Sequence, residues 1–313
     1  MIVKQNQPNL STAHFQPMGF HLRLDSNSPA ILAAAETSFG RFRPTQPGDS
    51  PDFIFRFFEH ELDDGPPASP VFKMEGPLLY QSTGRDATLV ADIERGLAYG
   101  YFSPTTVAHS ITFRWTFLEL AFFMMLEGRG LMGVHGAALV KHGRAILLRA
   151  QSGGGKTTLA YAAARSHYQA LAEDVVWLDQ ARGLWWGMPW SFHLLPDARQ
   201  LFPELAGYKP VLQTNQEMKL EVDLEIIRPG STTISAQPGP VVFVQRLPEN
   251  QSRLERISPD EARALWPIAR TGLEMKLPHH EAHLETLLSQ PAYRFYFGDD
   301  IERGVELLAG LFE

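Results

Sequence analysis

The first third of the chain contains several short runs with the pattern of β-strands. Residues 20–24 alternate apolar and polar side chains, which predicts a strand with one buried face. Residues 53–58, 87–92 and 97–102 are further predicted strands. The last two flank the turn-forming residues 94–96, so we expect them to pair as a hairpin.

A helix is predicted between the first two of these strands. Ser28 suits the N-cap position and Pro29 the first helical position, and the alanine-rich segment after them ends at Gly40. Residues 1–104 therefore predict a small α+β domain. It contains no catalytic constellation, so we expect a structural or substrate-holding role. Pro104 marks the predicted boundary to a second domain, residues 105–313.

Residues 107–127 have apolar side chains at helical spacing, including Phe113, Leu118 and Phe122. We predict a buried helix that braces the sheet of the second domain. The aromatic residues could instead mark a cofactor site, but core packing explains them more simply.

The second domain combines apolar strands with helices, which predicts an α/β fold. Residues 145–148 and 241–244 are fully apolar runs, and the latter is typical of a central strand. Ser258 and Glu261 form a capping-box pattern that opens a helix. The chain closes with a predicted strand over residues 293–297 and an amphipathic helix over residues 299–312.

Composition narrows the function classes. Of 313 residues, 44% are hydrophobic and 20% charged, and the net charge is −7, so nucleic acid and anionic membrane are not expected partners. The chain has no cysteine, which excludes disulfides, thiolate metal ligands and cysteine nucleophiles. Its start lacks a signal-peptide pattern, and its most apolar run, residues 115–126, is too short to span a bilayer. We expect a cytoplasmic protein and leave its oligomeric state open, a homo-oligomer included.

The main chemical signal is a glycine-rich turn between an apolar strand and a helix. Its residues are Ser152, Gly153, Gly154, Gly155, Lys156, Thr157 and Thr158. Glycines let backbone N–H groups approach a polyphosphate, Lys156 would reach the β- and γ-phosphates, and the Thr157 hydroxyl would bind Mg²⁺. Ala150 stands where the usual pattern begins with glycine, which costs little if its φ angle is negative.

Two further features stand at fixed distances from this loop. His135 lies 21 positions before Lys156, and the pair Glu173 and Asp174 follows it by 17 and 18 positions, directly after an apolar strand. With the loop, this arrangement resembles the C-terminal kinase domain of HPr kinase/phosphorylase, which phosphorylates a serine of a carrier protein. The resemblance is clear over about residues 130–190.

The resemblance implies a PEP-carboxykinase-like P-loop kinase fold with a mixed sheet. It also implies the use of ATP and Mg²⁺. It implies transfer of the γ-phosphoryl group to a serine hydroxyl of a peptide or small protein. One carboxylate of the pair would act as general base and the other would contact the metal beside Thr157. We favour Asp174 as the base and Glu173 as the metal-side group, with the reverse left open. His135 would sit near the transferred group and help to orient it, and a hydrogen-bonded core histidine is the alternative.

Three departures from the family pattern keep other functions open. Ala150 replaces the first loop glycine, Glu173 replaces the first aspartate of the pair, and no segment matches the family's later Glu-Val-Arg-Gly motif. A nucleotide-switched binding or ATPase module and a kinase of a free small molecule are therefore alternatives. Neither alternative alters the interpretation of the loop itself.

A few more side chains are candidates near or away from this site. Residues 187–195 are an extended segment that we expect to line it, and residues 213–219 are a predicted polar loop. Lys219, at its end, could reach a bound phosphate or simply be exposed. His279, His280 and His283 could chelate zinc, but they lack the H-E-x-x-H spacing and an obvious further ligand.

Overall fold

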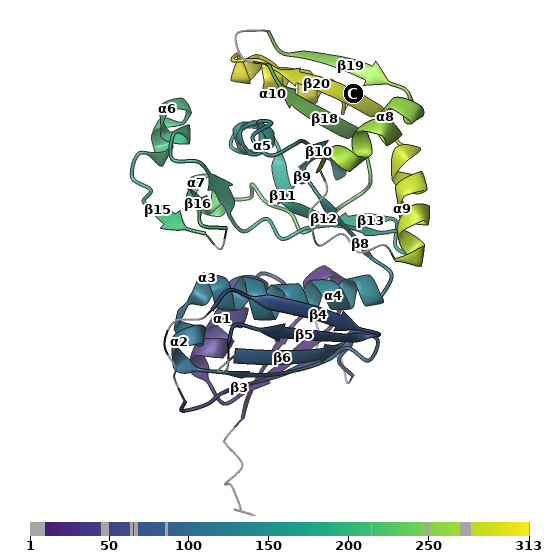
Figure 1. Ribbon diagram of the computed structural model, residues 1–313. Helices are drawn as coiled ribbons and strands as arrows, with labels where there is room; N and C mark the ends of the chain where they lie inside the picture. The colour runs from purple at the N-terminus through teal and green to yellow at the C-terminus, as the bar shows by residue number, and fades with distance from the viewer. Residues whose placement is uncertain are drawn as a thin grey trace, which may run out of the picture. The chain divides into compact units, whose positions relative to one another are not determined.

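The computed structural model divides into two compact units, Met1–Arg129 and Gly130–Glu313 (Figure 1). It describes residues 10–312 apart from 45–49, 63–64, 66–67, 85–86, 214, 248–250 and 270–276. The N-terminal residues 1–9, whose sequence argued against a signal peptide, lie outside the described residues. None of the helices described is long and apolar enough to cross a membrane.

The first unit is built on a seven-stranded sheet of order β1-β2-β3-β7-β6-β5-β4. The central strands β2, β3 and β7 are parallel and the other neighbours are antiparallel. The strands are β1 (Ser11–Phe15), β2 (Leu22–Ser26), β3 (Phe53–Glu59), β4 (Val71–Glu75), β5 (Leu78–Ser82), β6 (Ala87–Asp92) and β7 (Leu97–Phe102). The four predicted strands correspond to β2, β3, β6 and β7, and the hairpin of β6 and β7 is confirmed.

Helices cover one face of this sheet. They are η1 (Pro17–Gly19), α1 (Pro29–Phe39), α2 (Pro104–Ala108), α3 (Ser110–Phe113), the π-helical η2 (Arg114–Glu119) and α4 (Leu120–Gly128). The Ser28 hydroxyl caps α1, as the sequence predicted, by accepting a hydrogen bond from the Ile31 amide. Phe53, Phe55 and Phe57 alternate along β3 and are fully buried beneath the helices.

The aromatic helix of residues 104–128 belongs to this first unit, which corrects two expectations. Its Phe122 ring packs edge-on against Phe53 of β3, and its Phe113 ring packs against Phe102 of β7. The division between the units therefore falls at Arg129 and Gly130, not at Pro104, and the helix braces the first sheet rather than the second. The helical pattern indicated an apolar face but not the sheet that this face covers.

The second unit is a mixed α/β structure with three sheets. The largest has the order β11-β9-β10-β18-β20-β19, in which β10, β18 and β20 are parallel. Its strands are β9 (Ala137–Lys141), β10 (Arg144–Arg149), β11 (Gln169–Ala172), β18 (Val241–Arg246), β19 (Arg253–Ile257) and β20 (Ala292–Phe297). The apolar run at residues 241–244 is thus an inner strand, as predicted.

Two smaller sheets complete this unit, in the orders β17-β13-β12-β8 and β14-β16-β15. Their strands are β8 (Met132–His135), β12 (Val175–Asp179), β13 (Leu184–Trp186), β14 (Phe192–Leu194), β15 (Pro210–Leu212), β16 (Met218–Val222) and β17 (Ser235–Ala236). The predicted polar loop over residues 213–219 is shorter than expected, because β16 already begins at Met218.

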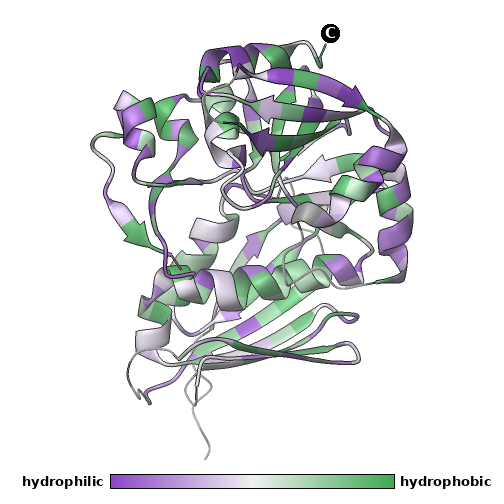
Figure 2. Cartoon of the chain, turned by 45° about the horizontal axis from the view of Figure 1, so that its top comes forward, coloured by the Kyte–Doolittle hydropathy of each residue, from purple (hydrophilic) through white to green (hydrophobic). Residues whose placement is uncertain are grey.

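Helices lie on both faces of the six-stranded sheet. The helices of the second unit are α5 (Lys156–Ala164), α6 (Ala198–Leu201), η3 (Pro203–Leu205), α7 (Leu224–Ile227), α8 (Pro259–Leu265), η4 (Trp266–Ala269), α9 (Pro278–Leu288) and α10 (Ile301–Ala309). Of these, α5 and α10 pack on one face of the sheet and α8 and α9 on the other. On β10, Ile146 and Leu148 pack with α5 and α10, whereas Ala145 and Leu147 pack with α8 and α9. This burial on both faces explains why the sequence of β10 is almost continuously apolar. Figure 2 shows hydrophobic residues, in green, along the strands of the sheets.

Candidate active site

The glycine-rich turn forms the loop between β10 and α5. Gly153 and Gly155 have φ angles of 76° and 84°, which residues other than glycine rarely adopt. Ala150 is not among the described residues with positive φ, so the departure from glycine introduces no backbone strain there. A Cβ on Gly154 would lie 2.9 Å from the Cβ of Ala150 and 2.9 Å from the carbonyl oxygen of Gln151, so the turn leaves no room for a side chain at 154.

The other predicted loop residues follow in the same turn. Ser152 is exposed at the tip of the loop, and Thr158 is half-buried in the first turn of α5. Lys156 begins the helix and is buried, with 9% of its surface exposed. Its Nζ donates to the Glu173 carbonyl oxygen at 2.8 Å and lies 3.3 Å from Oδ1 of Asp174. The loop lysine and the acidic pair therefore meet, as their spacing suggested.

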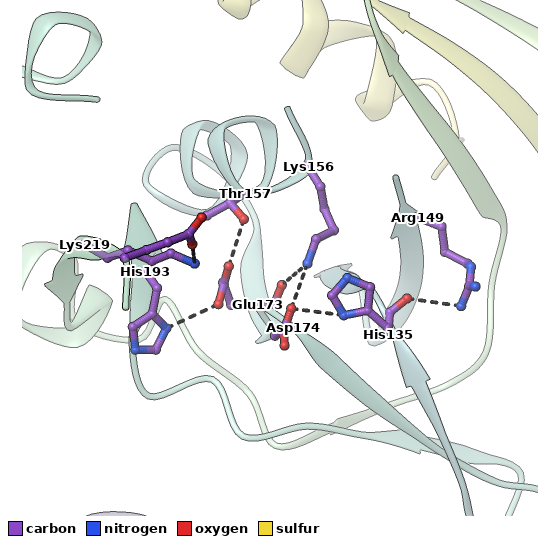
Figure 3. Close-up of polar contacts among 9 residues, drawn as sticks. His135, Arg149, Lys156, Thr157, Glu173, Asp174, His193 and Lys219 are labelled. Atoms are coloured by element: carbon purple, nitrogen blue, oxygen red, sulfur yellow. Dashed lines mark hydrogen bonds and ion pairs between the residues drawn. The ribbon is translucent and has the colours of Figure 1, made fainter. Parts of the chain in front are cut away.

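Both carboxylates turn into the site because β11 ends at Ala172. Along a continuing strand, neighbouring side chains would point to opposite faces. Glu173 instead accepts a hydrogen bond from the Thr157 hydroxyl at 2.8 Å, on Oε1. Its other oxygen, Oε2, lies 3.3 Å from Nδ1 of His193 on β14. Both oxygens of Glu173 are thereby held in place (Figure 3).

Asp174 contacts both Lys156 and His135 through Oδ1. Its Oδ1 lies 3.1 Å from Nδ1 of His135, the last residue of β8, and half of its side chain (53%) is exposed to solvent. Burial alone would raise the pKa of this carboxyl, but the contact with His135 and the charge of Lys156 outweigh it and hold the pKa well below its usual range. Asp174 is therefore a carboxylate at neutral pH.

The backbone also fixes His135 beside the acidic pair. In the ladder of β8 and β12, His135 is paired with Val175, and the Gly136 amide donates to the Asp174 carbonyl at 2.8 Å. The side chain of Arg149, at the end of β10, donates to the His135 carbonyl at 3.1 Å. His135 is thus placed by two neighbouring segments, residues 174–175 at the start of β12 and the end of β10.

The sequence did not single out two side chains that shape this site. Arg149 is 1% exposed and lies over the ring of Trp266, with 3.7 Å between its guanidinium carbon and the ring centroid. The sequence feature that could have identified Arg149 is its position as an arginine at the end of an apolar strand, directly before the loop. His193 lies in the extended segment that we expected to line the site, but no spacing tied it to Glu173.

The environment of His193 favours its charged form. Burial alone would lower the pKa of this histidine, but the contact with Glu173 and the negative charge of Glu221 outweigh burial and raise the pKa. Lys219, the candidate for a mobile phosphate ligand, lies nearby on β16 and pairs with Glu217 at 3.1 Å. In this arrangement Lys219 is engaged with a carboxylate and not with the loop.

The histidines considered for zinc make other contacts. Nδ1 of His283 donates to the backbone carbonyl of His279 at 2.9 Å, and Nε2 of His279 donates to the carbonyl of Leu131 at 3.2 Å. These are contacts of helix α9 with itself and with the segment before β8. They hold His279 and His283 through backbone carbonyl oxygens.

Comparison with known proteins adds little to this geometry. No protein-family model matches the sequence, and no curated protein matches it either. Matching solved structures include an HPr(Ser) kinase/phosphatase from Coxiella burnetii, with 12% sequence identity over 57% of this chain and 94% of that one. The TM-score is 0.29, so the likeness extends no further than a distant structural relationship.

Proposed function

We propose that the chain is an ATP-dependent kinase that transfers the γ-phosphoryl group to a serine hydroxyl of a peptide or small protein. One observation carries this proposal: Lys156, Thr157, Glu173, Asp174 and His135 converge at the end of one glycine-rich loop. Phosphoryl transfer needs charge neutralisation, a bound metal and a group that orients the attacking hydroxyl, and this set contains a candidate for each.

The loop and helix suit a triphosphate. The loop has two glycines in left-handed conformation, and α5, nine residues long, begins directly after it, so the positive end of the helix dipole lies at the loop. The buried Lys156 amine lies at this end of the helix. It would leave Asp174 for the β- and γ-phosphates when the nucleotide binds.

Thr157 and Glu173 suit a magnesium ion. Both offer oxygen ligands, and their oxygens lie 2.8 Å apart. Two adjacent ligands in an octahedral Mg²⁺ shell with bonds of 2.0–2.1 Å are about 2.9 Å apart, so this pair fits with little movement. The ion would neutralise charge on the β- and γ-phosphates during transfer.

Asp174 is the candidate for the group that accepts or orients the serine proton. Its carboxylate is half exposed, so an acceptor can reach it, and His135 holds it from one side. Once Lys156 moves to phosphate, one of the two interactions that lower its pKa is weakened, which makes the carboxylate a better base. We therefore keep Asp174 as the base and Glu173 as the metal-side carboxylate.

Our proposal includes a PEP-carboxykinase-like fold for the second unit. Its support is the order of elements: a strand, the loop and α5, followed by β11 with the acidic pair at its end. The choice of serine, and of a peptide or protein as acceptor, rests on the resemblance of these motifs to HPr kinase.

A labelling experiment tests the activity. We expect label from γ-labelled ATP to appear on serine when wild-type protein is incubated with small proteins and peptides encoded near its gene. The Asp174→Asn variant should lose this labelling while still binding nucleotide. If ATP is turned over but neither a protein nor a small molecule becomes labelled, the kinase proposal is contradicted and a nucleotide-switched module is favoured.

A further inference from the structure

His193 holds one oxygen of the carboxylate that we assign to the metal. Its Nδ1 lies 3.3 Å from Oε2 of Glu173, while the Thr157 hydroxyl contacts Oε1, as Figure 3 shows. Because a carboxylate only accepts hydrogen bonds, Nδ1 carries the hydrogen in this contact. The Glu173 side chain is 11% exposed, so little solvent competes with His193 for Oε2. The histidine therefore fixes the orientation of the carboxylate.

The strand that carries His193 is anchored on helix α5. Phe192 and Leu194, the neighbours of His193 on β14, are 1% and 2% exposed and belong to the core on that side of the sheet. The Phe192 ring packs edge-on against Tyr161 of α5, with 5.8 Å between the ring centroids. Thr157 lies in the first turn of the same helix. The two groups that donate to the carboxylate thus share one support.

This arrangement limits how many oxygens the carboxylate can give to a cation. Mg²⁺ takes six ligands in near-octahedral geometry and keeps several waters, whereas Ca²⁺ takes six to eight oxygens and can bind both oxygens of one carboxylate. With Oε2 held by His193, Glu173 presents Oε1, which lies 2.8 Å from the Thr157 hydroxyl oxygen. One oxygen suffices for Mg²⁺, but Ca²⁺ then lacks a ligand that it could otherwise take.

We propose that His193 is a positioning residue that sets the cation selectivity of this site. By holding Oε2, it makes Glu173 a one-oxygen ligand and so favours Mg²⁺ over Ca²⁺. The imidazole acts through Glu173 and does not itself touch the cation. This inference rests on the proposed function, because it takes Thr157 and Glu173 as ligands of a divalent cation.

Calorimetric titrations with a non-hydrolysable ATP analogue, in Mg²⁺ or in Ca²⁺, measure this selectivity without turnover. The quantity compared is the ratio of the Kd in Ca²⁺ to the Kd in Mg²⁺. His193→Leu releases Oε2, so we expect the ratio to fall at least about fivefold, chiefly through tighter binding in Ca²⁺. The His193 side chain is 34% exposed, so this change should leave the core intact. His193→Ala also releases Oε2 and should give the same fall.

Two further variants serve as controls. His193→Asn places an amide N–H near the position of Nδ1, so its ratio should stay within about twofold of that of wild type. His167→Leu, at an exposed histidine after α5, should also leave the ratio unchanged.

The outcomes separate this inference from the proposed function. A ratio that stays within about twofold of wild type in His193→Leu and His193→Ala would overturn the selectivity role. An equal fall in His193→Asn would also overturn it, because the hydrogen bond would then not be the cause. If wild-type protein binds the analogue in neither cation, the proposed function fails, and this inference fails with it.

A double variant tests whether His193 acts through Glu173. In a Glu173→Gln background the carboxylate is absent, so adding His193→Leu should change the ratio by less than about twofold. A fall in that background as large as the one in the wild-type background would show that His193 acts independently of Glu173 and would contradict the positioning role.

Discussion

Replacing each carboxylate of the acidic pair by its amide should separate their roles. Asp174→Asn keeps the side-chain shape but removes the charge that faces His135 and Lys156. Lys156 retains its hydrogen bond to the Glu173 carbonyl at 2.8 Å, so nucleotide should still bind. Loss of a general base typically slows a reaction by about 10²–10⁴, which corresponds to roughly 3–5 kcal/mol of barrier.

Glu173→Gln should act through the metal. One glutamine oxygen can still accept from Thr157 or from His193, but the amide nitrogen then faces the other donor, so one of the two contacts is lost. We expect the Mg²⁺ concentration for half-maximal rate to rise by roughly tenfold, with most of the rate regained at saturating Mg²⁺. The kcat should fall far less than in Asp174→Asn.

The assay is the rate of phosphoryl transfer at saturating ATP, measured over a series of Mg²⁺ concentrations. Asp197→Asn, at an exposed aspartate of the same unit, is the matched control and should behave as wild type. Thermal melts exclude misfolded variants. An active Asp174→Asn beside an inactive Glu173→Gln would reverse our assignment, and two active variants would refute the mechanism.

Three further variants test the loop and the first unit. Gly154→Ala should weaken ATP binding by at least about tenfold with little change in melting temperature, because the added Cβ would lie 2.9 Å from that of Ala150; titration calorimetry measures this. Asp25→Asn should lower the free energy of unfolding at pH 7 by about 1–3 kcal/mol, since the buried carboxylate pairs with Arg23. Burial alone would raise the pKa of Asp25, but its contacts with Arg23, Thr12 and Arg56 hold the folded-state pKa below the ordinary value of 3.8. The difference in stability between wild type and Asp25→Asn should therefore persist at pH 5 and disappear as the pH falls through this folded-state pKa. Urea unfolding midpoints measured over a pH series test this. Phe122→Ala should cost about 3–5 kcal/mol in urea unfolding because this ring is fully buried; a cost below about 1 kcal/mol would refute the packing described for the helix.

Local patterns predicted the parts of the site that are close in sequence. The strand, the glycine turn and the helix around Lys156 form one continuous segment, so spacing and residue type sufficed. The convergence of His135 and Asp174 on this lysine could be anticipated only through the resemblance to HPr kinase. The Ser28 cap and the hairpin of β6 and β7 were likewise local signals.

Features that depend on distant contacts could not be predicted in this way. The aromatic helix was assigned to the second unit because its pattern says nothing about which strands lie beneath Phe113 and Phe122. The role of His193 depends on β14, which brings the histidine to Glu173 from 20 positions away. The strand β4, at one edge of the first sheet, and its neighbour β5 were not predicted. Most residues of β4 are exposed, which gives the strand little apolar signal.

Binding of ATP in the presence of Mg²⁺ tests the central claim most directly. Isothermal titration should show one site in wild-type protein and in Lys209→Ala, which removes an exposed lysine of the same unit. Lys156→Ala should weaken binding at least about tenfold, because it removes the buried amine that would meet the phosphates. Absence of binding to wild-type protein, or equal affinity in Lys156→Ala, would contradict the account.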